Sequence, residues 1–125
     1  IILSLIKSKI NALEKYTKFL ICGFPKSEDN SKEWMKEMKN ANLKALIYIT
    51  YNRKEYETEL NERKSKGDGK IIEHSDAMKR YDYFLNQTTK VFDDIGLNKL
   101  IRVSSQLADN LIISNISHNK LITNL

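Results

Sequence analysis

The side chains best suited to chemistry in this chain are cations that could hold an anion. Lys26 directly follows the turn Gly23-Phe24-Pro25, and Arg80 lies in a segment with helical spacing. Arginine grips a phosphate or carboxylate through two parallel hydrogen bonds, whereas lysine acts as a point charge. The four arginines are Arg53, Arg63, Arg80 and Arg102. The sequence therefore indicates a limited capacity to hold phosphate groups.

The overall charge points weakly in the same direction. The chain has 125 residues, with 21 Lys and Arg against 16 Asp and Glu, which gives a net charge of +5. Most lysines are interleaved with acids, and no run alternates aromatic and basic residues as single-strand binding surfaces do. We therefore expect anionic small molecules rather than nucleic acid as partners.

Other chemistries have little support. Cys22 is the single cysteine, so an internal disulfide is impossible and a reducing, cytoplasmic location is indicated. His74 and His118 are distant from Cys22 in sequence, so the sequence indicates neither a set of metal ligands nor a nucleophile paired with a base. The apolar residues 1–6 are too few to span a bilayer, and no membrane partner is expected.

The first half of the chain predicts two strands and three helices. Apolar spacing predicts a helix over residues 2–14, and the apolar run 18–23, which ends at the turn, predicts a buried strand. Asp29, Asn30 and Ser31 are candidate caps for the next helix. Residues 43–51 predict a buried parallel strand, and the charged residues 52–64 a helix.

The second half predicts one long helix, a third strand and a last helix. Ser75 is predicted to cap the long helix, and Gly96 to stop it. Its predicted inward residues are Met78, Tyr81, Leu85, Thr88 and Phe92. Residues 99–103 predict a strand, with Ser104 or Ser105 capping a helix that turns Leu107 or Ala108, Leu111, Ile112 and Ile116 inward. This order predicts one α/β domain with a three-layer arrangement around a parallel sheet.

The run Lys18-Phe-Leu-Ile-Cys-Gly-Phe-Pro-Lys26 resembles the segment Phe-Leu-Ile-Asp-Gly-Phe-Pro-Arg of nucleoside monophosphate kinases. Asp29-Asn30 followed by Trp34 looks most like the UMP/CMP kinase branch, with adenylate kinases as the wider relatives. Met78-Lys79-Arg80-Tyr81 resembles the helix after that family's lid, and Ile101-Arg-Val-Ser104 its last core strand. The resemblance covers nearly the whole chain, at the family's spacing.

The resemblance implies a P-loop-kinase-like fold truncated at its N-terminus. Residues 1–15 would end the monophosphate-binding arm, residues 64–76 would form a degenerate lid, and the remainder would be core. The chain begins at Ile1 rather than Met, which also indicates a piece of a longer protein.

By residue-level transfer, the monophosphate of UMP or CMP, or less favourably AMP, would be bound by Gly23, Phe24, Pro25, Lys26 and Asn30. Arg80 would be the catalytic, phosphate-clamping arginine. ATP and Mg²⁺ would be the cofactors of the parent family.

Each assignment has a structural alternative. Gly23-Phe24-Pro25 can be only a strand-ending turn, and Asn30 only a helix cap. Arg80 can be a solvated helix charge.

Several positions depart from the family pattern. Cys22 replaces an aspartate near the metal's water shell, and Lys26 replaces an arginine. In the lid, Glu59, Gly69 and His74 stand where arginines are expected, and Ile71-Ile72 replaces an acidic pair. The four glycines, Gly23, Gly67, Gly69 and Gly96, do not have the spacing of a phosphate loop.

These departures predict that the chain does not transfer phosphoryl groups by itself, because one transition-state arginine alone is worth about a thousandfold. Two hypotheses remain. The chain is part of a monophosphate kinase, or it is a kinase-derived binding or dimerisation module. Without a central first strand the sheet would have open edges, so either the remaining strands close directly on each other or they pair with a second copy as a homodimer.

Overall fold

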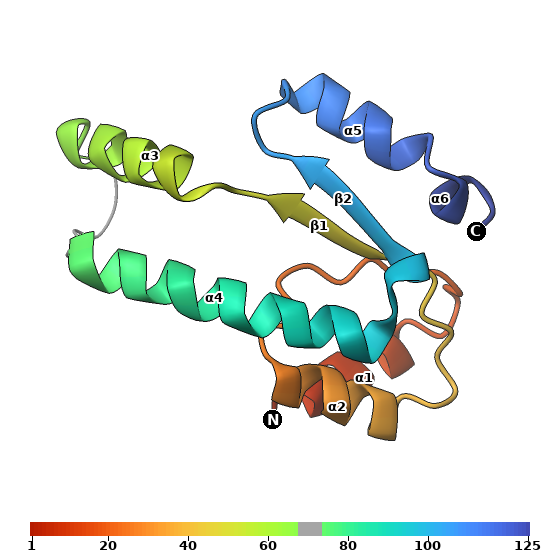
Figure 1. Cartoon of the computed structure of the whole chain (residues 1–125). Helices are drawn as coiled ribbons and strands as arrows, with labels where there is room; N and C mark the ends of the chain where they lie inside the picture. The colour runs from red at the N-terminus through yellow and green to blue at the C-terminus, as the bar shows by residue number, and fades with distance from the viewer. Residues whose placement is uncertain (68–73) are drawn as a thin grey trace.

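The structure is a computed structural model that describes residues 1–67 and 74–125. It is a mixed α/β fold that is mostly helical (Figure 1). In chain order the elements are α1 (Ile2–Ala12), α2 (Glu28–Glu37), β1 (Leu46–Thr50), α3 (Arg53–Ser65), α4 (His74–Ile95), the 3₁₀ helix η1 (Leu97–Lys99), β2 (Leu100–Ser104), α5 (Asp109–Ser117) and α6 (Lys120–Thr123).

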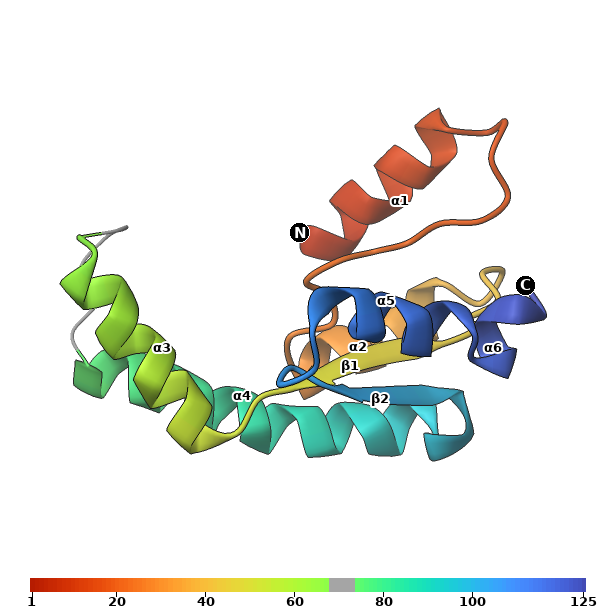
Figure 2. The same ribbon diagram turned by 90° about the horizontal axis from the view of Figure 1, so that it is seen from above.

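The two strands form a small parallel sheet in which Leu46 faces Leu100 and Thr50 faces Ser104. Figure 2 shows the strands lying between α4 and α5. Ile101 and Val103 are buried on one face of β2, while the Arg102 guanidinium lies 5.8 Å from the ring centroid of Phe92 on α4. Ile101 and Val103 alternate with the exposed Arg102 and Ser104, which is the period-two pattern of a strand with one buried face.

The strands predicted over residues 43–51 and 99–103 are therefore confirmed in a parallel sheet, with β1 shorter than predicted, and the structure adds that they pair with each other. The larger three-layer sheet of a truncated P-loop kinase is not formed by these two strands, and it stays a prediction.

The predicted strand over residues 18–23 is wrong. In the structure this segment has no strand pairing, and 41% of Phe19 and 79% of Leu20 remain exposed. A strand requires a neighbour that accepts and donates its backbone hydrogen bonds. The described part of the chain offers no such neighbour. Residues 18–23, whose apolar composition is typical of a buried strand, therefore form an exposed connecting segment.

Three predicted helix starts are also corrected. Ser27 caps α2 by accepting a hydrogen bond from the Asn30 backbone N–H, so Asp29, Asn30 and Ser31 lie inside the helix. Ser75 lies inside α4, which begins at His74. The helix predicted after Ser104 and Ser105 begins only at Asp109, where Ala108 provides no side-chain cap. At the start of α2 several good capping residues stand close together, and sequence alone ranks them poorly.

The helix predicted at 52–64 is confirmed, and its start has a clear cause. Asn52 accepts the Glu55 backbone N–H at 2.9 Å, while the Glu55 carboxylate accepts the Asn52 backbone N–H. This reciprocal capping box satisfies two backbone donors that a helix start otherwise leaves free. The predicted stop at Gly96 is confirmed as well, since Gly96 has φ +96°, a conformation that side chains with a Cβ rarely adopt.

Little of the described chain is fully buried. The buried apolar residues are Leu3, Ala77, Met78, Val91, Ile101 and Val103. Of the residues predicted to face inward, Leu85 and Leu111 are instead 38% and 50% exposed. Among the described helices, none combines the length and apolar character needed to cross a bilayer.

Candidate functional site

The predicted monophosphate residues form one compact turn ahead of α2. Gly23 has φ +77°, and the Phe24–Pro25 peptide bond is cis. The Lys26 backbone N–H donates to Asn30 Oδ1 at 3.1 Å, and the Phe24 ring lies 5.8 Å from that of Trp34. The side chain of Asn30 thus braces the turn from inside α2 and does not cap the helix, while the Lys26 side chain is exposed.

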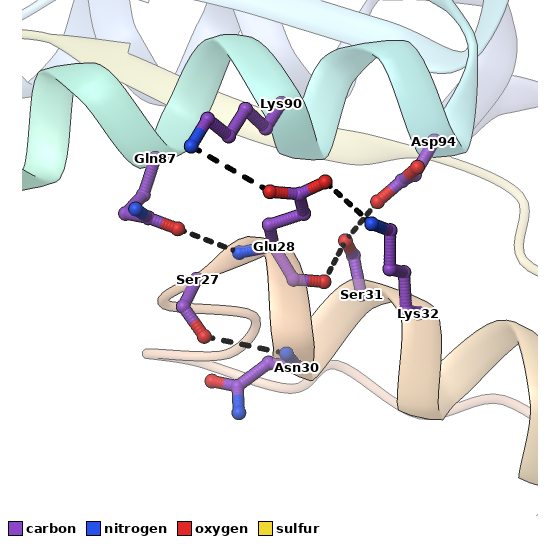
Figure 3. A network of polar contacts seen from close by, with 8 residues as sticks. All are labelled: Ser27, Glu28, Asn30, Ser31, Lys32, Gln87, Lys90 and Asp94. Carbon is purple, nitrogen blue, oxygen red and sulfur yellow. Dashed lines mark hydrogen bonds and ion pairs between the residues drawn. The ribbon is translucent and has the colours of Figure 1, made fainter.

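Polar contacts fix this turn onto α4 (Figure 3). The Glu28 backbone N–H donates to Gln87 Oε1 at 2.9 Å, and the Ser31 hydroxyl donates to Asp94 Oδ2 at 2.6 Å. Ser31 is only 1% exposed, so this contact is shielded from water. The start of α2, and the turn before it, are therefore held in place by the second half of α4.

The carboxylate of Glu28 joins the same network from the solvent side. It contacts the ammonium groups of Lys32 at 2.5 Å and Lys90 at 3.6 Å. The hydrogen bond from Lys32 lowers the pKa of the Glu28 carboxyl below its ordinary value, and the same contact raises the pKa of Lys32. These groups are solvent-exposed, so they orient the turn more than they stabilise the fold.

Arg80 and Glu59 lie apart from the turn, in a groove between α3 and α4 that we name the aromatic groove. It has a volume of about 430 Å³ and is lined by Tyr48, Ile49, Tyr51, Tyr56, Glu59, Leu60, Arg63, Arg80, Tyr81, Phe84 and Leu85. Arg80 precedes Gln87 by seven residues, which is about 10 Å along a helix. The structure therefore brings Arg80 together with Glu59 and Arg63, but places the turn farther along α4.

Tyrosines build one wall of the aromatic groove. The rings of Tyr56 and Tyr81 stack with centroids 5.1 Å apart, and Tyr51 meets Tyr56 edge-on at 6.0 Å. The Tyr81 hydroxyl donates to the Tyr51 carbonyl at 2.6 Å, and burial raises the pKa of Tyr81. This wall joins β1, α3 and α4, and its planar faces and two nearby arginines suit a planar anionic ligand.

The two arginines of this groove differ in their surroundings. The Arg63 guanidinium forms an ion pair with the Glu59 carboxylate one helical turn earlier. Arg80 is exposed, and it has no ion-pair partner among residues 1–67 and 74–125. Glu59 stands where the resemblance implies an arginine. Its carboxylate also pairs with the guanidinium of Arg63.

A second groove, of about 710 Å³, lies on the other side of α3 at the carboxyl ends of both strands. Its lining carries both signs of charge, with Glu55, Glu59 and Glu62 opposed by Lys54, Arg63 and Lys66. The capping box and a 3.3 Å hydrogen bond from Ser105 hold one oxygen of Glu55, and the other oxygen is buried without a described partner. Its balanced charge makes this groove a poorer site for an anion than the aromatic groove.

Several residues of the predicted lid lie outside the part of the chain that the structure describes. Gly69, Ile71 and Ile72 lie outside the described residues, and so does the side chain of His74. No group of three potential ligands that could hold a metal ion occurs among the residues the structure describes.

Sequence reasoning missed the tyrosine wall and the place of Arg63 in the groove. Tyr51 and Tyr81 are thirty positions apart, and no spacing rule links them.

No family model matches the chain, and no curated protein or solved structure matches it either. The likeness to nucleoside monophosphate kinases therefore rests on the quoted residues and their spacing.

Proposed function

We propose that this chain is a nucleotide-binding module of the nucleoside monophosphate kinase type that does not transfer phosphoryl groups by itself. The observation that carries the proposal is the aromatic groove, where Arg63 and Arg80 stand beside the stacked rings of Tyr56 and Tyr81. Arginine forks suit phosphate oxygens, and tyrosine faces suit a base or ribose. The ligand class that fits best is a pyrimidine nucleoside monophosphate, with Gly23 to Asn30 as the second half of the site.

Phosphoryl transfer needs more cationic groups than this site offers. In such reactions several arginines and a magnesium ion neutralise the charge of the moving group. Here Arg63 is paired with Glu59, and Lys26 can offer only a point charge. ATP and Mg²⁺ belong to the parent activity, and we assign neither a resident site in this chain.

Equilibrium titration of UMP onto matched variants tests the proposal. Arg80→Ala should weaken binding about tenfold or more, because a charge-assisted contact is lost. Lys79→Ala changes the same charge one position away, at an exposed residue outside the groove, and should leave the affinity within about twofold. Equal losses in the two variants would show that only net charge matters and would contradict the assignment.

A second variant tests the role of Glu59. Glu59→Gln removes the anion that pairs with Arg63, so the proposal expects tighter UMP binding by a few-fold. Weaker binding would mean that Glu59 itself contacts the ligand, for example by accepting a ribose hydroxyl.

A second candidate is an interaction module derived from such a kinase. The observation that favours it is β1, which pairs only with β2 within the described residues. Pairing of two copies through this edge would give the homodimer predicted above. Light scattering at rising concentration distinguishes a monomer from that dimer.

A further inference from the structure

Both strands of the sheet have an unpaired outer edge within the described residues, and the aromatic groove is lined by residues of β1 but by none of β2. Beyond β2, the one described hydrogen bond to the backbone of β1 comes from the Ser105 N–H, which donates to the Thr50 carbonyl at 3.0 Å. Ser105 directly follows β2, so this bond lies on the paired side. An unpaired strand edge presents free N–H and C=O groups, and added strands bind through them.

Apolar side chains surround this edge. Ile49 on β1 is 47% exposed, and Phe84 and Leu85 on α4 are 42% and 38% exposed. All three line the aromatic groove, which runs from β1 to α4. Side chains of an added strand alternate between the faces of the sheet, so every second one could enter this groove.

The segment between α1 and α2, residues 13–27, extends this apolar surface. We name it the strap. Figure 2 shows it on the side of the sheet nearer to β1 than to β2. Leu20 within it is 79% exposed. Lys18 anchors the strap to the end of the chain, since its ammonium donates to the Leu125 carbonyl at 3.1 Å.

The positive charge of the chain comes from the strap and the residues around β1. The strap and residues 38–54, which include β1, together contain seven Lys and Arg and a single acid, Glu14. The remainder of the chain has fourteen basic and fifteen acidic residues, so the whole positive excess comes from these two segments. Of the seven, Arg53 forms ion pairs with Glu57 and Asp82, and no ion pair of the other six occurs within residues 1–67 and 74–125.

This charge distribution indicates which kind of segment would bind at the β1 edge. Two copies meeting edge to edge would bring two basic segments together, and like charges in an interface oppose association. A segment with acids at its ends would be attracted instead. We propose that the β1 edge is a docking site for an extended, apolar segment with acidic flanks from a different protein. This edge shares Ile49, Phe84 and Leu85 with the aromatic groove, so a docked segment and a nucleotide would compete there. The like charges disfavour a second copy as its occupant.

The test uses a short fluorescent peptide with a central run of valine and isoleucine and glutamates at both ends. We expect saturable binding to the full chain by fluorescence anisotropy. Hydrogen exchange should slow at the amides of Leu46–Thr50. Raising salt from about 0.1 M to 1 M shortens the Debye length from about 10 Å to about 3 Å and should weaken binding several-fold. The same peptide with lysine ends should bind at least tenfold more weakly.

Matched variants locate the site. Ile49→Lys places a charge at the edge and should weaken the peptide about tenfold or more. Ile113→Lys makes the same change on α5, at a residue that is 65% exposed, and should have no effect. Leu20→Glu, on the 79% exposed strap residue, provides a second variant that does not touch the sheet and should also weaken binding. Far-ultraviolet circular dichroism confirms that each variant is folded.

Three results would overturn the proposal. The first is equal affinity for the glutamate-ended and lysine-ended peptides. The second is unchanged hydrogen exchange in Leu46–Thr50 at saturating peptide, or no saturable binding. The third is self-association of the unliganded chain that Ile49→Lys abolishes and Ile113→Lys does not, because the edge would then belong to a second copy.

Discussion

The contact between Ser31 and Asp94 gives the sharpest stability prediction, because it is short and shielded from water. The Ser31 hydroxyl donates to Asp94 Oδ2 at 2.6 Å and also lies 2.8 Å from the Glu28 carbonyl. Hydrogen bonds to charged groups contribute about 1.5–3 kcal/mol. Ser31→Ala removes the donor and leaves the carboxylate with one partner fewer. We therefore expect a loss of about 2 kcal/mol in the free energy of unfolding.

Chemical denaturation at pH 7 measures this loss, and thermal unfolding should show a decrease of roughly 8 °C for a domain of this size. Ser8→Ala is the matched control. Ser8 is an exposed helical serine on α1 with no described side-chain hydrogen bond, and its change should stay within about 0.5 kcal/mol. A double-mutant cycle with Asp94→Asn should give a coupling of about 1 kcal/mol or more between the two positions.

A loss below about 0.5 kcal/mol in Ser31→Ala, or a coupling near zero, would refute this reasoning. It would mean that the contact does not hold α2 on α4. The turn from Gly23 to Asn30 would then lack the support that the proposed site requires.

Three further predictions concern single contacts. Tyr81→Phe removes the hydroxyl that donates to the Tyr51 carbonyl but keeps the stacked ring, so denaturation should show a loss of about 1 kcal/mol. Gly23→Ala should cost about 1 kcal/mol from its φ of +77°. Gly96→Ala should cost more, because φ 96° with ψ 137° is a backbone conformation that residues with a Cβ strongly disfavour, and the reverse order would contradict this account. The hydrogen bond from Lys32 lowers the pKa of Glu28 in the folded chain. The ionised Glu28 therefore stabilises the fold at pH values above the ordinary carboxyl pKa, and this stabilisation is lost as the pH falls through the lowered pKa of Glu28. Glu28→Gln should therefore lower the urea midpoint at pH 7, and this difference should disappear in strong acid.

Local signals in the sequence predicted helices at the places of α1 to α5 and both paired strands, but not the short helices η1 and α6. The charged run 52–64, the stop at Gly96 and the apolar run 43–51 are all short-range features. The run 18–23 shows the limit of such signals. Its composition fits a buried strand, but a strand forms only where a neighbour is present, and this is a property of the whole fold.

The candidate site was predictable only in part, for a related reason. Gly23, Phe24 and Pro25 were recognisable as a turn because glycine and proline act locally. The aromatic groove depends on Tyr51, Tyr56 and Tyr81, which meet because α3 and α4 fold back along each other. The ion pair between Glu59 and Arg63 has a helical spacing that sequence can suggest, whereas its place beside Arg80 required the structure.

Calorimetric titration of the unmodified chain with UMP tests the central claim most directly. The proposal predicts saturable binding of one UMP per chain with a dissociation constant below about 1 mM, which corresponds to about 4 kcal/mol. Addition of ATP and Mg²⁺ should then yield no UDP. Absence of heat at millimolar UMP would contradict nucleotide binding, and formation of UDP would contradict the claim that this chain cannot transfer phosphate by itself.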